Sequence, residues 1–250
     1  IETGAGLNTL TLSGGTNTVT GGADADSITT TSGTNIINAG DGADTIQLNG
    51  GFNTVNAQAG IDTIIATSGY NTLDAGDGDD IISLSGGFNT VQGSSGTDSI
   101  TATGGTNVID GGLDNDTITL NDGTNTVDAG LGDDTITANT ATAIQSVLAS
   151  GGRIDGGAGV DTLKLAAGTQ LDLTAITGNQ TVKPIQEVEV FEMQGGSSLT
   201  LSANSVLSLG GANLSGYDFT TVSNAQSGGT SSTGKVQFVV NGQVGDSLVL

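Results

Sequence analysis

The chain of 250 residues contains no cysteine, no histidine and no tryptophan, and it has only one proline and seven aromatic residues. The absence of cysteine excludes disulfide bonds and thiolate chemistry. The absence of histidine excludes imidazole zinc sites and the usual general base with a pKa near neutrality. No apolar run reaches the roughly 18 residues of a membrane-spanning helix, so we expect no membrane insertion.

Basic residues are scarce as well, with 4 Lys and Arg against 26 Asp and Glu and a formal net charge of −22. A charge of this size repels phosphate backbones and anionic membrane surfaces, so we expect no nucleic-acid partner. Hard cations that prefer oxygen ligands are the partners that this composition favours. The chain begins at Ile1 with no leader, and we expect it to be a piece of a longer or processed protein.

What is present is a repeat of nine residues. From Thr3 to Thr137 the chain divides without insertion or deletion into fifteen such units. The fourth position is Gly in thirteen units and Asp in two. The eighth position is aliphatic in every unit: Leu10, Val19, Ile28, Ile37, Ile46, Val55, Ile64, Leu73, Ile82, Val91, Ile100, Ile109, Ile118, Val127 and Ile136.

The sixth position shows that the true period is eighteen residues. After Asn8, this position alternates between asparagine and aspartate. The asparagines are Asn17, Asn35, Asn53, Asn71, Asn89, Asn107 and Asn125. The aspartates are Asp26, Asp44, Asp62, Asp80, Asp98, Asp116 and Asp134.

A nine-residue unit with glycine-rich corners and one aliphatic position is typical of a short strand followed by a tight turn, not of a helix. Two units make one coil, and coils stack about 4.8 Å apart, so residues eighteen apart lie above one another. We therefore predict an all-β fold, a parallel β-roll or β-solenoid of 18-residue coils. The eighth position and the residue two later are expected to point inward.

Two segments carry a family resemblance. Residues 75–82 (AGDGDDII) and 156–163 (GGAGVDTL) resemble the Gly-Gly-x-Gly-x-Asp-x-aliphatic repeat of the repeats-in-toxin, or hemolysin-type calcium-binding, family. With the fifteen repeat units between Thr3 and Thr137, the resemblance covers over half of the chain. It implies a parallel β-roll with calcium ions held between successive turns, and export by type I secretion.

The stacked aspartates predict the calcium ligands. Like charges one coil apart repel by about 1 kcal/mol in water, and a dication between them removes this repulsion with help from exposed turn carbonyls. Without cations we expect residues 1–152, which hold 18 acidic and no basic residues, to be expanded or disordered. The extra turn acids, such as Asp79 and Asp133, are not expected to bind the metal directly; we expect them to be solvated or to strengthen the negative electrostatic field around it. The predicted ligands are Asp26, Asp44, Asp62, Asp80, Asp98, Asp116, Asp134 and Asp161.

The opposite edge departs from the family, which usually carries aspartate on both edges. Asparagine is neutral and can stack as a hydrogen-bonded amide ladder. We therefore expect this edge to be mostly free of metal. The fifth position of the same units holds three aromatic residues, Phe52, Tyr70 and Phe88, which form a possible contact strip. These rings either stiffen the corner or bind a neighbouring copy or a glycan.

The period breaks after Thr137. We predict a calcium-binding β-roll over 1–137, an insert with a short helix over 138–155, and a last nonapeptide turn with a β-rich cap over 156–250. Asp161 follows Asp134 by 27 residues, and the extra nine fall in the Asn half, so Asp161 should return to the Asp edge. Segments 185–191, 199–204 and 240–247 loosely resemble stretches that follow calcium repeats in giant bacterial surface adhesins.

Three roles are compatible with these features. The first is a calcium-stabilised structural module of a secreted bacterial cell-surface adhesin or matrix protein, folding outside the cell. The second is a self-assembling surface-layer or filament subunit. The third is the non-catalytic calcium-binding tail of a secreted enzyme. We expect no catalytic site, because neighbouring acids such as Asp79 and Asp80 lie in a calcium turn and point to opposite faces.

Overall fold

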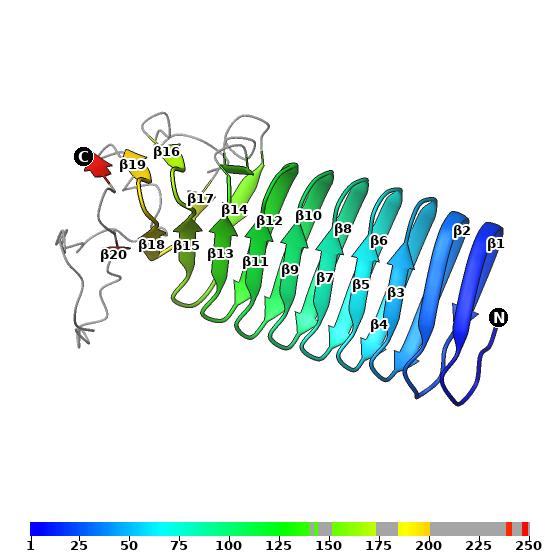
Figure 1. Ribbon diagram of the computed structural model, residues 1–250. Helices are drawn as coiled ribbons and strands as arrows, with labels where there is room; N and C mark the ends of the chain where they lie inside the picture. Colours follow the sequence, from blue (N-terminus) through cyan, green and yellow to red (C-terminus); the bar gives the residue numbers. More distant parts are fainter. Residues whose placement is uncertain (141–142, 145–151, 174–184, 201–238, 242–246, 250) are drawn as a thin grey trace.

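The computed structural model describes residues 1–140, 143–144, 152–173, 185–200, 239–241 and 247–249. Its strands stack side by side into one elongated parallel solenoid, with the N-terminus at one end of the stack (Figure 1). All described strand pairs between residues 9 and 165 are parallel. The predicted all-β parallel β-roll is confirmed.

Each regular coil contains one strand of four residues and one of eight. The first two strands are longer because they run through the Asn corner: β1 (Thr9–Thr20) and β2 (Ser27–Asp41). The short strands are β3 (Thr45–Leu48), β5 (Thr63–Ala66), β7 (Ile81–Leu84), β9 (Ser99–Ala102), β11 (Thr117–Leu120) and β13 (Thr135–Ala138). The long strands are β4 (Phe52–Ala59), β6 (Tyr70–Asp77), β8 (Phe88–Ser95), β10 (Thr106–Leu113) and β12 (Thr124–Leu131).

The register follows the eighteen-residue period. Asn53 pairs with Asn71 and Asn71 with Asn89 along the long strands, and Ile64 pairs with Ile82 along the short ones. Because every coil has the same length, each column of the solenoid collects one sequence position. A repeated residue type therefore becomes a continuous stripe along the molecule.

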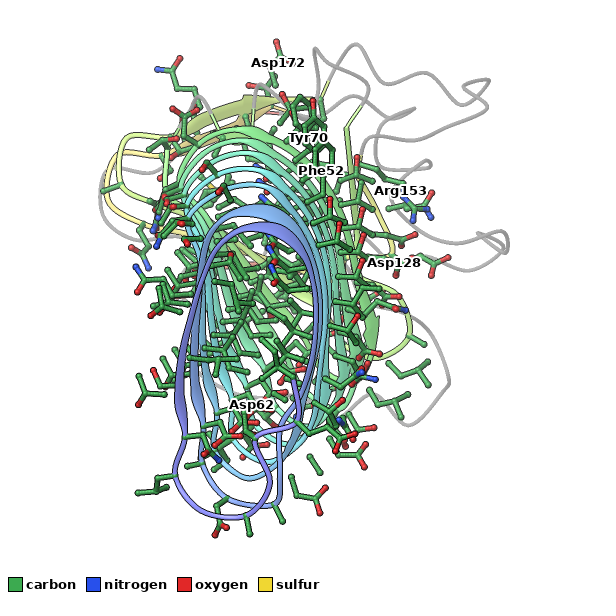
Figure 2. All side chains as sticks on the ribbon, turned by 90° about the vertical axis from the view of Figure 1, so that its right-hand side faces the viewer. Phe52, Asp62, Tyr70, Asp128, Arg153 and Asp172 are labelled. Carbon is green, nitrogen blue, oxygen red and sulfur yellow. The ribbon has the colours of Figure 1, made fainter. Side chains whose placement is uncertain are left out.

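The interior is a thin layer of aliphatic side chains. Ile82 and Leu84 point inward from β7, and Val91 points inward from β8; all three are at most 1 % exposed. The view along the axis in Figure 2 shows this flattened cross-section packed with side chains. The sixth position is inward as well, so the Asp and Asn side chains lie at the two narrow ends of the core.

The roll continues past the insert. β14 (Arg153–Asp155) pairs with β12, and β15 (Thr162–Leu165) pairs with β13. Asp161 therefore lies one coil after Asp134, as the spacing predicted. The predicted insert helix falls mainly on residues 141–142 and 145–151, which lie outside the described residues. Ala143 and Ile144 are described and are fully buried.

Further strands extend the stack. β17 (Ile185–Gln186) pairs with β14, β18 (Val190–Met193) with β15, and β20 (Val239–Asn241) with β18. A second parallel sheet consists of β16 (Gln170–Asp172), β19 (Ser198–Thr200) and β21 (Ser247–Val249). Most of segments 199–204 and 240–247 lies outside the described residues. Within the described ranges no helix is long and apolar enough to cross a membrane.

Candidate metal centre

The eight predicted aspartates form one buried column. Each is at most 2 % exposed, and they follow one another coil by coil along one edge of the roll. Figure 2 shows Asp62 at the narrow end opposite Phe52 and Tyr70. We call this column the Asp file: Asp26, Asp44, Asp62, Asp80, Asp98, Asp116, Asp134 and Asp161.

One oxygen of each carboxylate links two coils. The backbone N–H of Asp62 donates to Oδ1 of Asp80 over 2.6 Å, and that of Asp80 donates to Oδ1 of Asp98 over 2.8 Å. The same bond recurs along the whole file at 2.6–2.9 Å, including the step from Asp134 to Asp161. The fold therefore holds Oδ1 in place, whereas Oδ2 takes no part in these bonds between coils.

The second oxygen is buried without a partner. Oδ2 makes no hydrogen bond and is shielded from solvent in seven members of the file: Asp44, Asp62, Asp80, Asp98, Asp116, Asp134 and Asp161. A buried carboxylate oxygen without a hydrogen-bond partner costs free energy, and a bound cation would offset this cost.

The pKa values reflect the same arrangement. Burial raises the pKa of Asp62, Asp98 and Asp116 to about 7 and that of Asp80 to about 6, and neighbouring acids add to the effect. Burial likewise raises the pKa of Asp161 to about 7. The pKa of Asp44 and Asp134 is raised for the same reason. Bonds from the backbone N–H groups oppose this shift in every case.

Backbone carbonyls lie beside the free oxygens. A Cβ atom placed on Gly111 would collide with the carbonyl oxygen of Ala129 and would lie 2.5 Å from Oδ2 of Asp116. Both oxygens therefore face the same space beside the Gly111 Cα. In the described part of the chain no three acidic side chains converge on one point, so an ion in the file must also use such carbonyls.

These residues fit a hard dication. All of the ligand atoms are oxygens, the carboxylates are stacked without a counter-charge, and the Oδ2 atoms of seven of the eight have no hydrogen-bond partner. The Asp file and the adjacent turn carbonyls would hold Ca²⁺, which accepts six to eight oxygen ligands in flexible geometry. Calcium supplies no redox or acid–base chemistry here; it neutralises stacked charge.

The extra turn acids have a structural role that the sequence interpretation missed. Asp79 Oδ1 accepts the backbone N–H of Thr97 over 2.8 Å, and Asp133 Oδ1 accepts that of Val160 over 2.9 Å. Both carboxylates thus link the outer corners of successive coils, in addition to being exposed to solvent. The sequence did contain a signal for these bonds, because Thr97 follows Asp79 by one 18-residue coil and Val160 follows Asp133 by the 27 residues of the coil with the insert.

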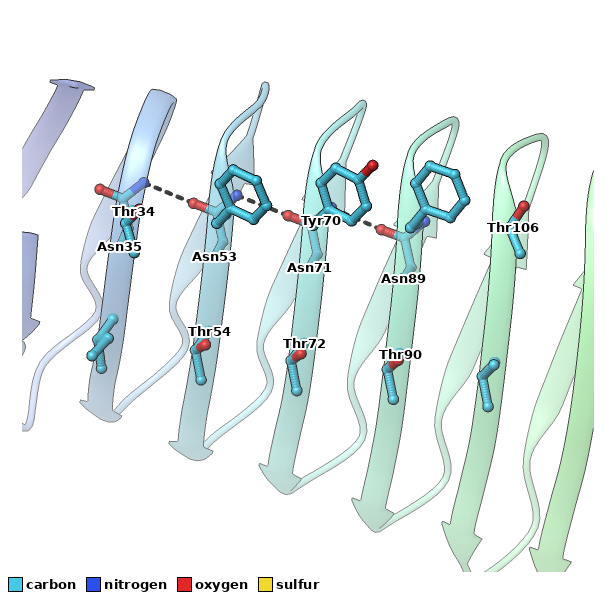
Figure 3. Close-up of a pocket in the computed structure, with 14 residues that line it drawn as sticks. Thr34, Asn35, Asn53, Thr54, Tyr70, Asn71, Thr72, Asn89, Thr90 and Thr106 are labelled. Atoms are coloured by element: carbon cyan, nitrogen blue, oxygen red, sulfur yellow. Dashed lines mark hydrogen bonds between the residues drawn. The ribbon is translucent and has the colours of Figure 1, made fainter. Parts of the chain in front are cut away.

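The opposite edge is an amide ladder, as the sequence predicted. Each Asn Nδ2 donates to Oδ1 of the next Asn over 2.8 Å, in six consecutive bonds from Asn17 to Asn125. Figure 3 shows the part of this ladder from Asn35 to Asn89. The same Nδ2 also donates to a corner carbonyl three residues earlier over 3.0–3.2 Å. These amides are satisfied by one another and offer no free oxygen comparable to Oδ2 of the Asp file.

The predicted contact strip is a stack of exposed rings. Phe52 and Tyr70 are stacked with centroids 5.0 Å apart, and Tyr70 and Phe88 with centroids 4.9 Å apart. Each ring remains 52–58 % exposed. A shallow groove of about 500 Å³ runs beside them, and the column of Thr54, Thr72 and Thr90 also lines it (Figure 3).

Comparison with known proteins agrees with this geometry. The model of the RTX calcium-binding nonapeptide repeat matches residues 1–28, 20–55, 29–64, 56–91, 85–118 and 119–140. These matches together cover 140 of the 250 residues. No curated protein and no solved structure matches the chain. Repeats of this kind are structural, bind several calcium ions and typically occur in secreted proteins. The chain belongs to the RTX calcium-binding nonapeptide repeat family.

Proposed function

We propose that this chain is a calcium-stabilised structural module of a secreted bacterial cell-surface adhesin or matrix protein, which folds outside the cell when it binds Ca²⁺. The observation that carries the proposal is the row of seven buried Oδ2 atoms without partners. The ligands are the aspartates of the Asp file. The repeats supply a long, stiff scaffold, and the exposed faces supply contacts.

Charge supports folding after export. Residues 1–152 carry 18 acidic groups and no basic one, and the file stacks eight of the chain's carboxylates with no counter-charge. Calcium is scarce in the cytosol and plentiful outside the cell, so the ion that offsets this repulsion becomes available only after secretion.

Amide hydrogen exchange at two free calcium concentrations tests this proposal. The concentrations are about 10⁻⁷ M and about 10⁻³ M, the range between intracellular and extracellular sites, with millimolar Mg²⁺ present in both. We expect β3 to β13 to be protected only at the higher concentration. Equal protection at both concentrations would overturn the proposal, because the module would then fold before export.

We further propose that Phe52, Tyr70 and Phe88 are the contact surface of the module. Exposed stacked rings beside a groove lined only by uncharged residues suit a neutral partner on a chain that is otherwise strongly anionic. The occupant in the adhesin role is a glycan. A neighbouring copy on the same strip is the occupant in the alternative role of a self-assembling surface-layer or filament subunit.

The chain itself provides the control for this surface. The same column holds Thr34 before Phe52 and Thr106 after Phe88, so a variant with threonine at all three positions restores a residue that the corner already accommodates. We expect calcium-driven folding to be unchanged and binding to glycan-coated beads to be lost. Loss of self-association measured by light scattering, with bead binding intact, would favour the filament subunit. No change in either assay would exclude a contact role.

A further inference from the structure

The Asp file does not end at Asp161. The backbone N–H of Asp161 donates to Oε2 of Glu189 over 2.9 Å, the same bond that Asp134 makes to Oδ1 of Asp161 over 2.9 Å. The register agrees, because Thr162 of β15 pairs with Val190 of β18. Glu189 therefore occupies the next place in the file, beyond the residues that the family model matches.

A glutamate suits this place because the corner before it is short. Four residues, 157–160, separate Gly156 from Asp161, whereas Val188 alone separates Glu187 from Glu189. Glu187 has φ of 50°, in the left-handed region, which lets the chain turn within so few residues. The extra methylene of glutamate lets the carboxylate still reach the N–H of Asp161.

The gap between these two coils also contains a buried oxygen without a partner. Asp161 is fully buried, and its Oδ2 makes no hydrogen bond. A Cβ atom placed on Gly156 would collide with the carbonyl oxygen of Glu187 and would lie 2.8 Å from Oδ2 of Asp161. The two oxygens therefore face one space beside the Gly156 Cα, as at Gly111 earlier in the roll.

No basic side chain of the described ranges neutralises this pair of acids. Arg153 bonds to Asp128 and Asp155, with N–O distances of 3.1 and 2.8 Å, and Lys164 lies 3.5 Å from Glu192. A buried aspartate and a half-buried glutamate thus share a gap without a counter-charge, and a bound cation would remove the cost of this uncompensated charge.

We propose that the gap between Asp161 and Glu189 is a further calcium site, built from Oδ2 of Asp161, the Glu189 carboxylate and the carbonyl oxygen of Glu187. This inference rests on the proposed uptake of calcium by the Asp file. The ion joins the coil of β17 and β18 to the last nonapeptide turn. Order in this coil, and in what stacks on it, therefore depends on calcium although the coil lacks the nonapeptide.

The test replaces Glu189 by Gln in the full chain, which keeps the shape and an oxygen acceptor for the Asp161 N–H but removes the charge. The bound calcium ions are counted by native mass spectrometry, and exchange of the amides in 185–193 is followed at millimolar calcium. We expect one ion fewer than in the wild type and exchange in this coil faster by about tenfold or more. Exchange in β5 to β9 should not change. Glu192→Gln is the matched control, because it removes a carboxylate three residues away, in β18 and outside the site.

An unchanged ion count in Glu189→Gln would overturn the inference, as would an equal loss in Glu192→Gln. If the coil of Glu189→Gln is disordered at every calcium concentration, Glu189→Asp decides instead. The aspartate side chain is one methylene shorter, so we expect this variant to bind one ion more weakly and to regain that ion at higher calcium. If higher calcium does not restore the order of the coil, the proposed site is wrong. A wild-type chain that binds no calcium would refute the proposed function, whereas a wild type that binds calcium with an unaffected variant refutes this site alone.

Discussion

Replacing Asn71 by Ala tests the claim that the two edges of the roll work by different physics. Asn71 makes three hydrogen bonds: it accepts from Asn53 Nδ2 over 2.8 Å, and it donates to Asn89 Oδ1 over 2.8 Å and to the Ser68 carbonyl over 3.2 Å. At about 0.5–1.5 kcal/mol each, their loss lowers the free energy of unfolding by about 1.5–4.5 kcal/mol. The buried Oδ1 of Asn89 also loses its only described donor, which places the expected value in the upper half of this range.

Asn125→Ala is the matched control, because Asn125 is also buried but ends the ladder. It accepts from Asn107 over 2.8 Å and donates to the Asp122 carbonyl over 3.2 Å, and its removal takes the donor from no amide oxygen of the ladder. Two bonds at the same value correspond to about 1–3 kcal/mol. The cost of Asn125→Ala should therefore be clearly smaller than that of Asn71→Ala.

Urea unfolding at saturating calcium measures both variants, with amide exchange in β4, β6 and β8 as the local readout, because a solenoid can open coil by coil. The number of bound calcium ions should be the same in both variants and in the wild type. An equal cost for the two variants would refute the ladder as a cooperative unit. A lower ion count in Asn71→Ala would show that the Asn edge binds metal and would refute the division between the edges.

Two further predictions concern acid and packing. Burial raises the pKa of Asp62, Asp98, Asp116 and Asp161 to about 7, so between pH 4 and 7 the folded calcium-free chain binds more protons than the unfolded chain. The stability of the calcium-free chain is therefore greatest below about pH 4 and falls as the pH rises through 7. Circular dichroism of calcium-stripped protein should show more β-structure at pH 4.5 than at pH 7.5. More β-structure at pH 7.5 would contradict the burial of the Asp file. Gly111→Ala should lower the unfolding free energy by about 1–3 kcal/mol, because its methyl group meets the Ala129 carbonyl. Gly195→Ala is the control, since a Cβ atom there meets nothing within 4 Å, and equal melting temperatures for the two variants would contradict the tight approach of the coils.

The fold could be predicted because a single repeat period determines the direction, the register and the facing of the strands. A repeat without insertions forces parallel strands, sets the register and assigns each position to one column, so the buried Ile82 and Leu84 followed from spacing alone. The return of Asp161 to the Asp edge after 27 residues followed from the same counting. The amide ladder was predictable because asparagine recurs at the one position that faces its own copy in the next coil.

What the sequence did not reveal lies where the period gives no information. Oδ1 of each aspartate accepts the backbone N–H of the preceding coil, whereas Oδ2 of seven of the eight has no hydrogen-bond partner, and the residue spacing alone does not predict this difference. Glu189 was missed because 28 residues and a shortened corner separate it from Asp161. A signal was present, since Glu189-Val190-Phe191 repeats the acid-x-apolar order, with Phe191 fully buried. The bridge from Arg153 to Asp128 and Asp155 was missed for the same reason, because the insert hides the pairing of β12 with β14.

Titration of calcium into chelator-treated protein, followed by far-ultraviolet circular dichroism, tests the central claim most directly. The account predicts a change from coil to β-structure at sub-millimolar to millimolar calcium, the range of extracellular calcium modules, with magnesium ineffective because it demands strict octahedral geometry. A β-rich spectrum at neutral pH that chelator does not change would contradict it, because the Asp file would then be a column of buried acids that folds without metal.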